Sequence, residues 1–121
     1  MVEVMSASPA ISIICSCFNH GRYVPEMLAS VHAQSFPDYE VVIVNDGSTD
    51  GTKEILDNLH HEKLTVIHTQ NHGPAAARNT AIAAAKAPVI LNLDADDKIA
   101  PSLLAQAYKL FDADPHIGIV G

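Results

Sequence analysis

The sequence predicts an α/β protein with three layers, in which helices cover both faces of a mainly parallel β-sheet. Short apolar runs alternate along the chain with segments of helical periodicity. The apolar runs are continuous, which is typical of strands that are buried on both faces of a parallel sheet. The chain has 121 residues, of which 48% are hydrophobic, so it is long enough for one domain with a buried core.

The first half of the chain is expected to form three strands and two helices. After the first strand, apolar residues recur at i, i+3, i+4 and i+7, which predicts an amphipathic helix with Pro25 in its first turn. The expected elements are a strand over 11–17, a helix carrying Val24, Met27, Leu28 and Val31, a strand over 40–44, a short helix carrying Ile55, Leu56 and Leu59, and a strand over 64–68.

The second half continues the same alternation. The segment 74–86 is rich in alanine, the strongest helix former, and predicts a helix. The remaining elements are a strand over 88–93, a helix opened by Pro101 with Leu104, Ala107, Tyr108 and Phe111 facing inward, and a strand that starts in 116–120. Residues 1–9 are expected to be a disordered leader, and 10–121 a domain whose fifth strand starts just before residue 121.

The two ends of the predicted sheet differ in their chemistry. Every junction from a strand to a helix carries Asn or Asp, and three of the four carry Gly, whereas the opposite junctions look like ordinary solvated turns. The four polar junctions are 18–21, 45–48, 71–74 and 94–97. Ligands of open parallel sheets bind at the carboxyl ends of the strands, so these junctions are the predicted site.

Asp94, Asp96 and Asp97 follow the fourth apolar run directly. Two carboxylates about 5 Å apart repel by roughly 3 kcal/mol at an effective dielectric constant of about 20, so holding them together requires a cation. Oxygen ligands favour a hard divalent metal. The alternative is a solvated acidic loop in which Asp97 caps a helix. An EF-hand would need Gly and Glu where Ile99 and Ala105 stand, and a phosphatase nucleophile would end the first strand rather than the fourth.

Three further residues each allow a functional and a structural interpretation. Asp46 could accept a hydrogen bond from a base or a ribose, or serve only as a turn residue. Phe18 could be a stacking platform for a base, or pack in the core. Arg78 lies in the first turns of a helix, where it could reach a phosphate or form a surface ion pair.

Charge and cysteine content exclude some classes of partner. The formal charge of −7 argues against nucleic acid or an anionic membrane held by general electrostatics. Cys15 and Cys17 are predicted to be buried free thiols, which fits a reducing compartment. The chain has no G-x-G-x-x-G after the first strand, no Walker loop and no G-x-S-x-G.

Taken together, the junctions resemble those of the family 2 glycosyltransferases, enzymes with the GT-A-type, Rossmann-like nucleotide-diphospho-sugar transferase fold. The resemblance is carried by ISIICSCFNHGRYVPEMLASVHAQSFPDYEVVIVNDGSTDGT, by NHGPAAARNTAIAAAKAPVILNLDADD and by the helix after Pro101. It extends over about 11–120, nearly the whole chain.

The resemblance implies a role for each matching residue. Phe18 would stack on the base and Asp46 would hydrogen-bond it. Asp94 and Asp96 would form a D-x-D motif, in which Asp94 contacts the ribose and the metal, and Asp96 is the main ligand of a Mn²⁺ or Mg²⁺ ion that bridges the diphosphate. The implied nucleotide-binding residues are Phe18, Asn19, Asp46, Gly73, Arg78 and Asp94, and the implied metal ligands are Asp96 and Asp94.

The chain departs from the family pattern at two positions. Phe18 stands where the family commonly has tyrosine, so the ring is kept and the hydroxyl is lost. Asn45 replaces the first of two aspartates that usually precede Gly-Ser, while Asp46 keeps the second.

The implied activity is a metal-dependent, inverting transfer of a sugar from a nucleotide-diphosphate sugar, by resemblance a UDP-sugar, to an acceptor hydroxyl. The acceptor would be a glycan or a lipid-linked molecule of polysaccharide or cell-envelope assembly. The resemblance also implies that the domain over 10–121 is truncated at its C-terminus. The catalytic base is expected beyond residue 121, so no catalytic residue is assigned in this chain. The expected location is the cytoplasm or the inner face of the membrane, and self-association is expected through an exposed sheet edge.

Two alternatives remain at this point. The chain could bind a nucleotide without transferring a sugar. It could also be a receiver-like phospho-acceptor domain, although that class predicts an acid pair at the end of the first strand, where Cys17, Phe18 and Asn19 stand.

Overall fold

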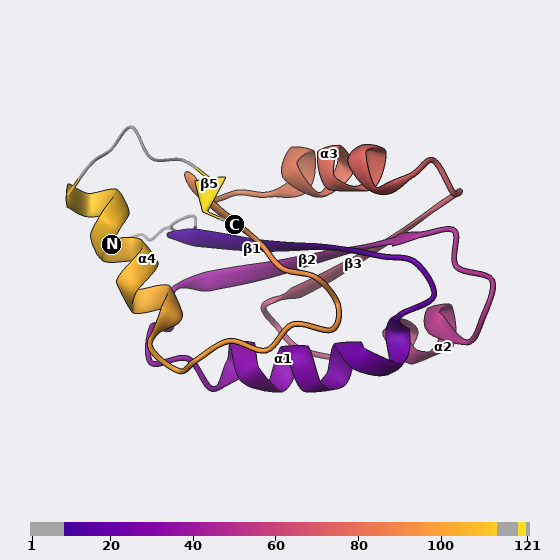
Figure 1. Cartoon of the computed structure of the whole chain (residues 1–121), viewed down its shortest axis with the longest axis horizontal. Coiled ribbons are helices and arrows are strands. Elements are labelled where there is room, and N and C mark those ends of the chain that lie inside the picture. The colour runs from indigo at the N-terminus through magenta and orange to yellow at the C-terminus, as the bar shows by residue number, and fades with distance from the viewer. Residues whose placement is uncertain (1–8, 114–118, 121) are drawn as a thin grey trace, which may run out of the picture.

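The computed structural model describes residues 9–113 and 119–120 and shows a five-stranded sheet between layers of helices (Figure 1). The strand order is β3-β2-β1-β4-β5, and every neighbouring pair is parallel. The strands are β1 Ile11–Cys17, β2 Tyr39–Asp46, β3 Leu64–Thr69, β4 Val89–Asn92 and β5 Ile119–Val120. The predicted α/β class with a parallel sheet is confirmed.

The helices lie on both faces of the sheet. Helix α3 covers one face, and α1 and α2 cover the other (Figure 1). The helical elements are the 3-10 turn η1 Gly21–Tyr23, α1 Val24–His32, α2 Thr52–Asp57, α3 Pro74–Ala84 and α4 Leu103–Ala113. Within the described residues, no helix combines the length and the hydropathy needed to cross a bilayer.

The core consists of two clusters that the sheet separates. Ile13 and Ile14 are adjacent in β1 but belong to different clusters, because successive side chains of a strand point to opposite faces. The larger cluster lies on the α1 side and includes Leu104 of α4. On the other face, the small side chains of Ala77 and Ala81 pack α3 against β1, β2 and β4. The inward face predicted for the helix after Pro101 is confirmed in α4.

Some element boundaries differ from the prediction. Strand β2 is longer than 40–44, because both Asn45 and Asp46 still pair with β3. Helix α3 ends at Ala84 rather than at residue 86, since Ala85 is already extended and the nearby Pro88 disfavours helical geometry before it. Of the leader expected over 1–9, residues 1–8 lie outside the described residues. Of the strand start expected in 116–120, residues 116–118 lie outside them, and Ile119–Val120 forms β5.

The strand order determines where a ligand can bind. From β1 to β3 the chain adds strands on one side of β1, and α3 then carries it across the sheet to place β4 on the other side. In open α/β sheets, ligands bind beyond the carboxyl ends of the strands where the winding reverses. The junctions after β1, β2 and β4 therefore surround the expected binding crevice.

Candidate functional site

Phe18 is the first residue after β1, and 43% of its surface is exposed. An exposed phenyl ring at this position contradicts the alternative in which Phe18 packs in the core. It leaves an accessible aromatic face at the carboxyl end of the sheet, where a planar group could stack on it.

Asn19 holds the junction after β1 in a tight turn. Its φ of 58° lies in the left-handed region, which asparagine tolerates better than other residues with a Cβ. The Asn19 N–H donates to Ser48 Oγ over 3.0 Å, and Asn19 Oδ1 accepts the Thr49 N–H over 2.8 Å. The junctions after β1 and β2 are thus joined by hydrogen bonds in both directions.

Asn45 and Asp46, the last residues of β2, send their side chains to opposite faces of the sheet. Asn45 contacts His68 of β3 over 3.1 Å and accepts the Ser48 N–H over 3.2 Å. Asp46 instead reaches the segment before α3. Both are buried, Asn45 at 3% exposure and Asp46 at 4%.

The carboxylate of Asp46 organises the start of α3. Its two oxygens accept the backbone N–H groups of His72 over 2.9 Å and Gly73 over 3.1 Å. The Asn71 amide also donates to the Asp46 carbonyl over 3.2 Å. Asp46 therefore positions the Gly73 segment through its hydrogen bonds to the backbone.

Two glycines in these junctions have positive φ. Gly47 has φ 65°, and a Cβ there would overlap the backbone nitrogen of Asn71. Gly73 has φ 95° and precedes Pro74, the first residue of α3. Both positions require the freedom of glycine, so turn chemistry is sufficient to account for these residues.

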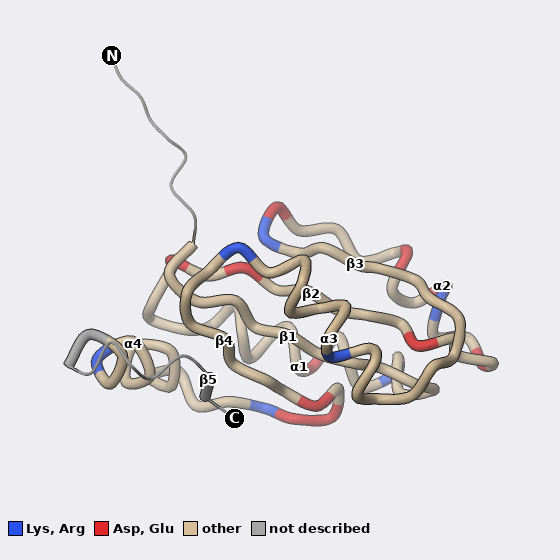
Figure 2. The backbone as a smooth tube through the Cα atoms, turned by 90° about the horizontal axis from the view of Figure 1, so that it is seen from above, with Lys and Arg blue, Asp and Glu red and all other residues tan. Residues whose placement is uncertain are grey.

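The acidic loop after β4 brings three carboxylates together. Asp94, Asp96 and Asp97 each offer a carboxylate oxygen, and these oxygens lie within 4.8 Å of one another. The loop is closed by the Asp97 N–H, which donates to the Asp94 carbonyl, and by the Asp94 N–H, which donates to Asp97 Oδ2. Ala95 is buried between the two exposed aspartates and anchors the turn. Figure 2 shows this loop as the red stretch after β4.

This set of donors fits a hard divalent cation. Carboxylate oxygens in groups of two or three, open to solvent, suit Mg²⁺ or Mn²⁺, which also retain water and phosphate ligands. The sequence pointed to Asp94 and Asp96, and the structure adds Asp97, whose side chain was considered only as a helix cap. Its hydrogen bond to the Asp94 N–H closes the turn and does not cap a helix.

The negative charge of the acidic loop affects the pKa of a buried thiol in β1. Burial above all raises the pKa of Cys15, and the neighbouring Cys17 and the carboxylates of Asp94, Asp97 and Asp96 raise it further. Burial also raises the pKa of Cys17. Both cysteines are buried and free, as predicted, and stay protonated near neutral pH.

Arg78 lies in the second turn of α3 and is exposed. Among the described residues, the ion pairs are Lys53–Asp57 and Lys98–Glu26, and the contact of His68 with Asp57 is an ion pair only when the imidazole is protonated. The surface ion pair considered for Arg78 does not form there. Its guanidinium is free to meet an anion at this helix start, which already favours negative charge.

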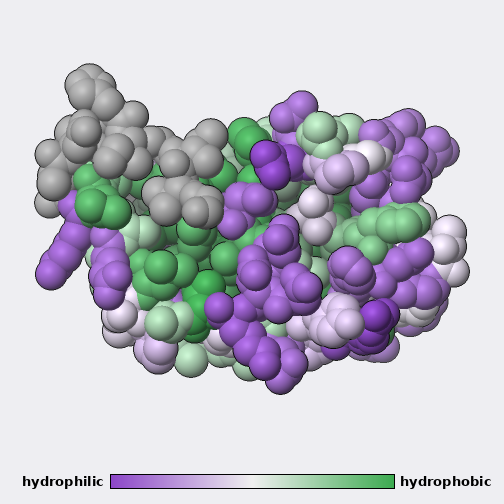
Figure 3. Space-filling model, in the orientation of Figure 1, coloured by the Kyte–Doolittle hydropathy of each residue, from purple (hydrophilic) through white to green (hydrophobic). Residues whose placement is uncertain are grey.

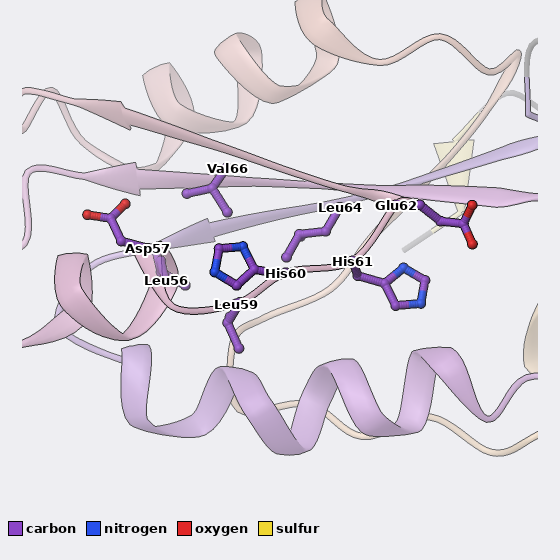
Figure 4. Close-up of a pocket in the computed structure, with 8 residues that line it drawn as sticks. All are labelled: Leu56, Asp57, Leu59, His60, His61, Glu62, Leu64 and Val66. Carbon is purple, nitrogen blue, oxygen red and sulfur yellow. The ribbon is translucent and has the colours of Figure 1, made fainter.

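A cavity of about 610 Å³ lies away from these junctions, beneath β3 (Figure 4). It is lined by Leu56, Asp57, Leu59, His60, His61, Glu62, Leu64 and Val66. None of these residues belongs to the predicted site. The hydrophilic surface that Figure 3 shows over the right half of the molecule, toward which β1 runs in Figure 1, is the better match to a charged ligand.

The interaction between Asn45 and His68 was not predicted. In the sequence, Asn45 stands out only as a departure from a family pattern, and His68 is one of seven histidines. The signal that would have found the pair is the register, because Asn45 and His68 are direct partners at the ends of parallel β2 and β3.

Comparison with protein families and known proteins agrees with this architecture. The model of "Glycosyl transferase family 2" matches residues 12–121. An uncharacterized glycosyltransferase of Nostoc is 36% identical over 91% of this chain, and the glycosyltransferase GlyG of Streptococcus pneumoniae is 33% identical over 92% of it. The chain spans about a third of the length of such relatives, 35% and 39% for these two.

Solved structures show the same fold. The chain aligns with S. aureus TarS in complex with UDP-GlcNAc at a TM-score of 0.78 and 34% identity, over 86% of this chain and 31% of TarS. It aligns with the mannosyltransferase PcManGT from Pyrobaculum calidifontis, in complex with GDP-Man and Mn²⁺, at a TM-score of 0.79 and 32% identity, over 91% and 34%. Because the family model covers nearly all of the chain, this protein belongs to glycosyltransferase family 2.

Proposed function

We propose that this chain binds the donor of a glycosyltransferase that moves a sugar from a UDP-sugar to an acceptor hydroxyl, with inversion at the anomeric carbon and with Mn²⁺ or Mg²⁺. The observation that carries the proposal is the group of three carboxylates within 4.8 Å of one another, directly after β4. Such a group is stable only in water or with a cation, and a diphosphate needs the same cation.

Each element contributes one part of the proposed donor site. Phe18 stacks on the base, and Asn19 sets the turn that presents the ring. Asp46 hydrogen-bonds the base and holds the Gly73 segment, and Arg78 meets the diphosphate beside the start of α3. Asp94 and Asp96 hold the metal, with Asp94 also on the ribose.

The chemistry of transfer follows from charge. When bound, the divalent metal neutralises the diphosphate and makes it a better leaving group. The carboxylates of Asp94 and Asp96 orient that charge, and the exposed loop leaves room for the sugar. We place the catalytic base and the acceptor site in the part of the enzyme beyond residue 121, which fits the fraction of the relatives that the chain spans.

The relatives support the choice of ligand class. The structure of TarS holds UDP-GlcNAc and that of PcManGT holds GDP-Man with Mn²⁺, so both bases occur on this fold. For this chain uridine stays a prediction from the resemblance. A glycan or lipid-linked acceptor of polysaccharide or cell-envelope synthesis, a cytoplasmic location or one at the inner face of the membrane, and self-association through a sheet edge also stay predictions.

The second candidate function is nucleotide binding without transfer. It is favoured by the fact that the chain spans only about a third of its relatives. Sugar transfer by this chain to any acceptor would contradict it. The receiver-like alternative has no support, since the glycosyltransferase family 2 model matches residues 12–121 of the chain.

The deciding experiment is calorimetric titration of UDP into the chain, first with Mn²⁺ and then with EDTA. We expect binding that requires the metal and that Asp96→Asn weakens at least tenfold. The matched control is Asp38→Asn, because Asp38 is an exposed aspartate in the turn before β2, at the opposite end of the sheet. UDP affinity that is equal in wild type and Asp96→Asn would show that the acidic loop is not the metal site.

A further inference from the structure

A continuous chain of hydrogen bonds runs from α2 across β3 and β2 to the junction after β1. Asp57 Oδ1 lies 2.8 Å from His68 Nε2, and His68 Nδ1 lies 3.1 Å from Asn45 Nδ2. Asn45 Oδ1 accepts the Ser48 N–H over 3.2 Å, and Ser48 Oγ accepts the Asn19 N–H over 3.0 Å. This chain ends at the turn that presents the proposed stacking ring.

The donors and acceptors of this chain are consistent with only one state of His68. The Asp57 carboxylate can only accept, so the proton lies on Nε2 and Nδ1 carries a lone pair. That lone pair accepts the amide proton of Asn45, which turns the amide oxygen toward the Ser48 N–H. Every group in the chain is then satisfied when the imidazole is neutral.

Protonation of His68 breaks this arrangement. In the imidazolium, Nδ1–H would face the Asn45 NH₂ group, so two donors would meet. Rotation of the amide would satisfy His68 but would point the NH₂ group at the Ser48 N–H. Asn45 cannot accept from both neighbours at once, because its amide has a single oxygen. One hydrogen bond is lost in either orientation.

The surroundings of His68 do not remove this conflict. From α2 it faces the Asp57 carboxylate, which also pairs with Lys53 over 2.7 Å. From β2 it faces neutral Asn45. Cys17 of β1 lies beside Asn45 in register, and its thiol is uncharged because burial raises its pKa. The His68 side chain is 30% exposed, so protons reach it from solvent.

We propose that His68 is a positioning residue that, as a neutral imidazole, fixes Asn45 and Ser48 and thereby holds the Asn19 turn and its neighbouring ring in place for the nucleotide. The proposal rests on the proposed function for its effect on binding. The family's more usual aspartate at position 45 would not have this property, since a carboxylate accepts from Ser48 and from imidazolium together. Asn45 therefore makes the junction sensitive to pH.

Three variants test the proposal by UDP titration with Mn²⁺ at pH 8.0 and pH 5.5. His68→Asn keeps an acceptor near the position of Nδ1 and does not titrate, so its affinity at pH 8.0 should match wild type. His68→Leu removes the acceptor and should weaken binding about fivefold at pH 8.0, the equivalent of one neutral hydrogen bond. Any effect of pH on UDP itself or on metal binding is common to all variants and cancels in the ratio to His68→Asn.

The pH dependence carries the decisive result. Relative to His68→Asn, wild type should lose about fivefold in affinity between pH 8.0 and pH 5.5. Asn45→Asp should show no such loss, whatever its affinity at pH 8.0. A ratio of wild type to His68→Asn that does not change with pH, or a His68→Leu affinity equal to wild type, would overturn the proposal.

Nuclear magnetic resonance separates this proposal from the proposed function, because it needs no nucleotide. The imidazole nitrogen shifts should show the proton on Nε2 at pH 8.0. The protection of the Ser48 amide, which is its exchange rate relative to the intrinsic rate at the same pH, should be lower at pH 5.5 than at pH 8.0. If these signals appear but UDP never binds, the positioning network stands and the proposed function fails. A proton on Nδ1 at pH 8.0 would refute the network itself.

Discussion

Phe18 shows at the scale of one residue how exposure separates function from packing. A phenyl ring that is 43% exposed contributes little to the core, yet lies at the edge of the sheet where ligands bind. The cost of removing it should therefore appear in binding and not in folding.

We expect Phe18→Ala to weaken UDP binding by about 5- to 150-fold, which corresponds to the roughly 1–3 kcal/mol of one base stacked on an aromatic ring. The midpoint of urea unfolding should stay close to wild type. Phe18→Tyr restores the residue usual in the family and should keep the affinity. Calorimetry of the three proteins checks this, and equal affinity of Phe18→Ala and wild type would remove the stacking role.

Asp46 shows the opposite balance, because its carboxylate is buried and satisfied by the backbone. Asp46→Asn would turn one acceptor into a donor that faces the N–H of His72 or Gly73. We expect a loss of about 1–3 kcal/mol in the free energy of unfolding, the cost of an unsatisfied buried group. Urea unfolding measures it, with Asp38→Asn as the exposed control. Equal stability of the two variants would show that the two N–H contacts contribute nothing.

The elements follow the periodicity of the sequence closely. Continuous apolar runs became β1, β2 and β4, and the apolar face of 24–31 became the buried side of α1. Local sequence patterns were sufficient to predict these elements, because the side chains that an element buries determine the period of its apolar residues. The sequence predicts a longer α3 than the structure shows, since no capping residue marks the end of the helix and alanine continues a helix well.

The site was predictable only in part. Junction chemistry indicated which residues gather, and the structure brings Asp94 and Asp96 together with Asp97. The partners of Asp46 and Asn45 could not be predicted, because they depend on strand register and on backbone N–H groups of a distant loop. Such contacts arise from tertiary structure and produce no periodic pattern in the sequence.

The turn after β2 offers a matched pair of glycines for a test at the level of an element. Gly47→Ala forces a Cβ into the backbone of Asn71 at a φ of 65°, and should cost about 2–4 kcal/mol of stability. Gly51→Ala meets nothing within 4 Å and has an ordinary φ of −79°, so it should cost less than about 1 kcal/mol. Thermal or urea unfolding of the two variants compares them. Similar losses would mean that the turn relaxes to accept a side chain.

The stability of the whole molecule should fall in alkaline solution because of its buried thiols. The pKa of Cys15 is raised from its ordinary value of 9.0 by burial, and burial raises the pKa of Cys17 as well. Above pH 9 the unfolded chain loses thiol protons that the folded chain keeps, so the free energy of unfolding decreases as pH rises. Below that range the contribution is fully present.

We expect Cys15 alone to account for a loss of about 1–2 kcal/mol between pH 8 and pH 10. Urea unfolding at several pH values measures the slope. Cys15→Ala is less stable throughout because it leaves a void, but its slope should be shallower by that amount. An unchanged slope would show that Cys15 ionises in the folded state.

The order of the strands has a consequence for how the protein is made. Strands β1, β2 and β3 can pair as soon as they leave the ribosome, whereas β4 must return across the sheet to the free edge of β1, from Val89 to a partner at Ile11. Contacts between such distant parts of a chain form slowly. The proposed surface for the base can thus form early in synthesis. The acidic loop reaches its position later, when β4 pairs with β1. A nascent chain would hold its future base site for some time before it has anywhere to place a metal.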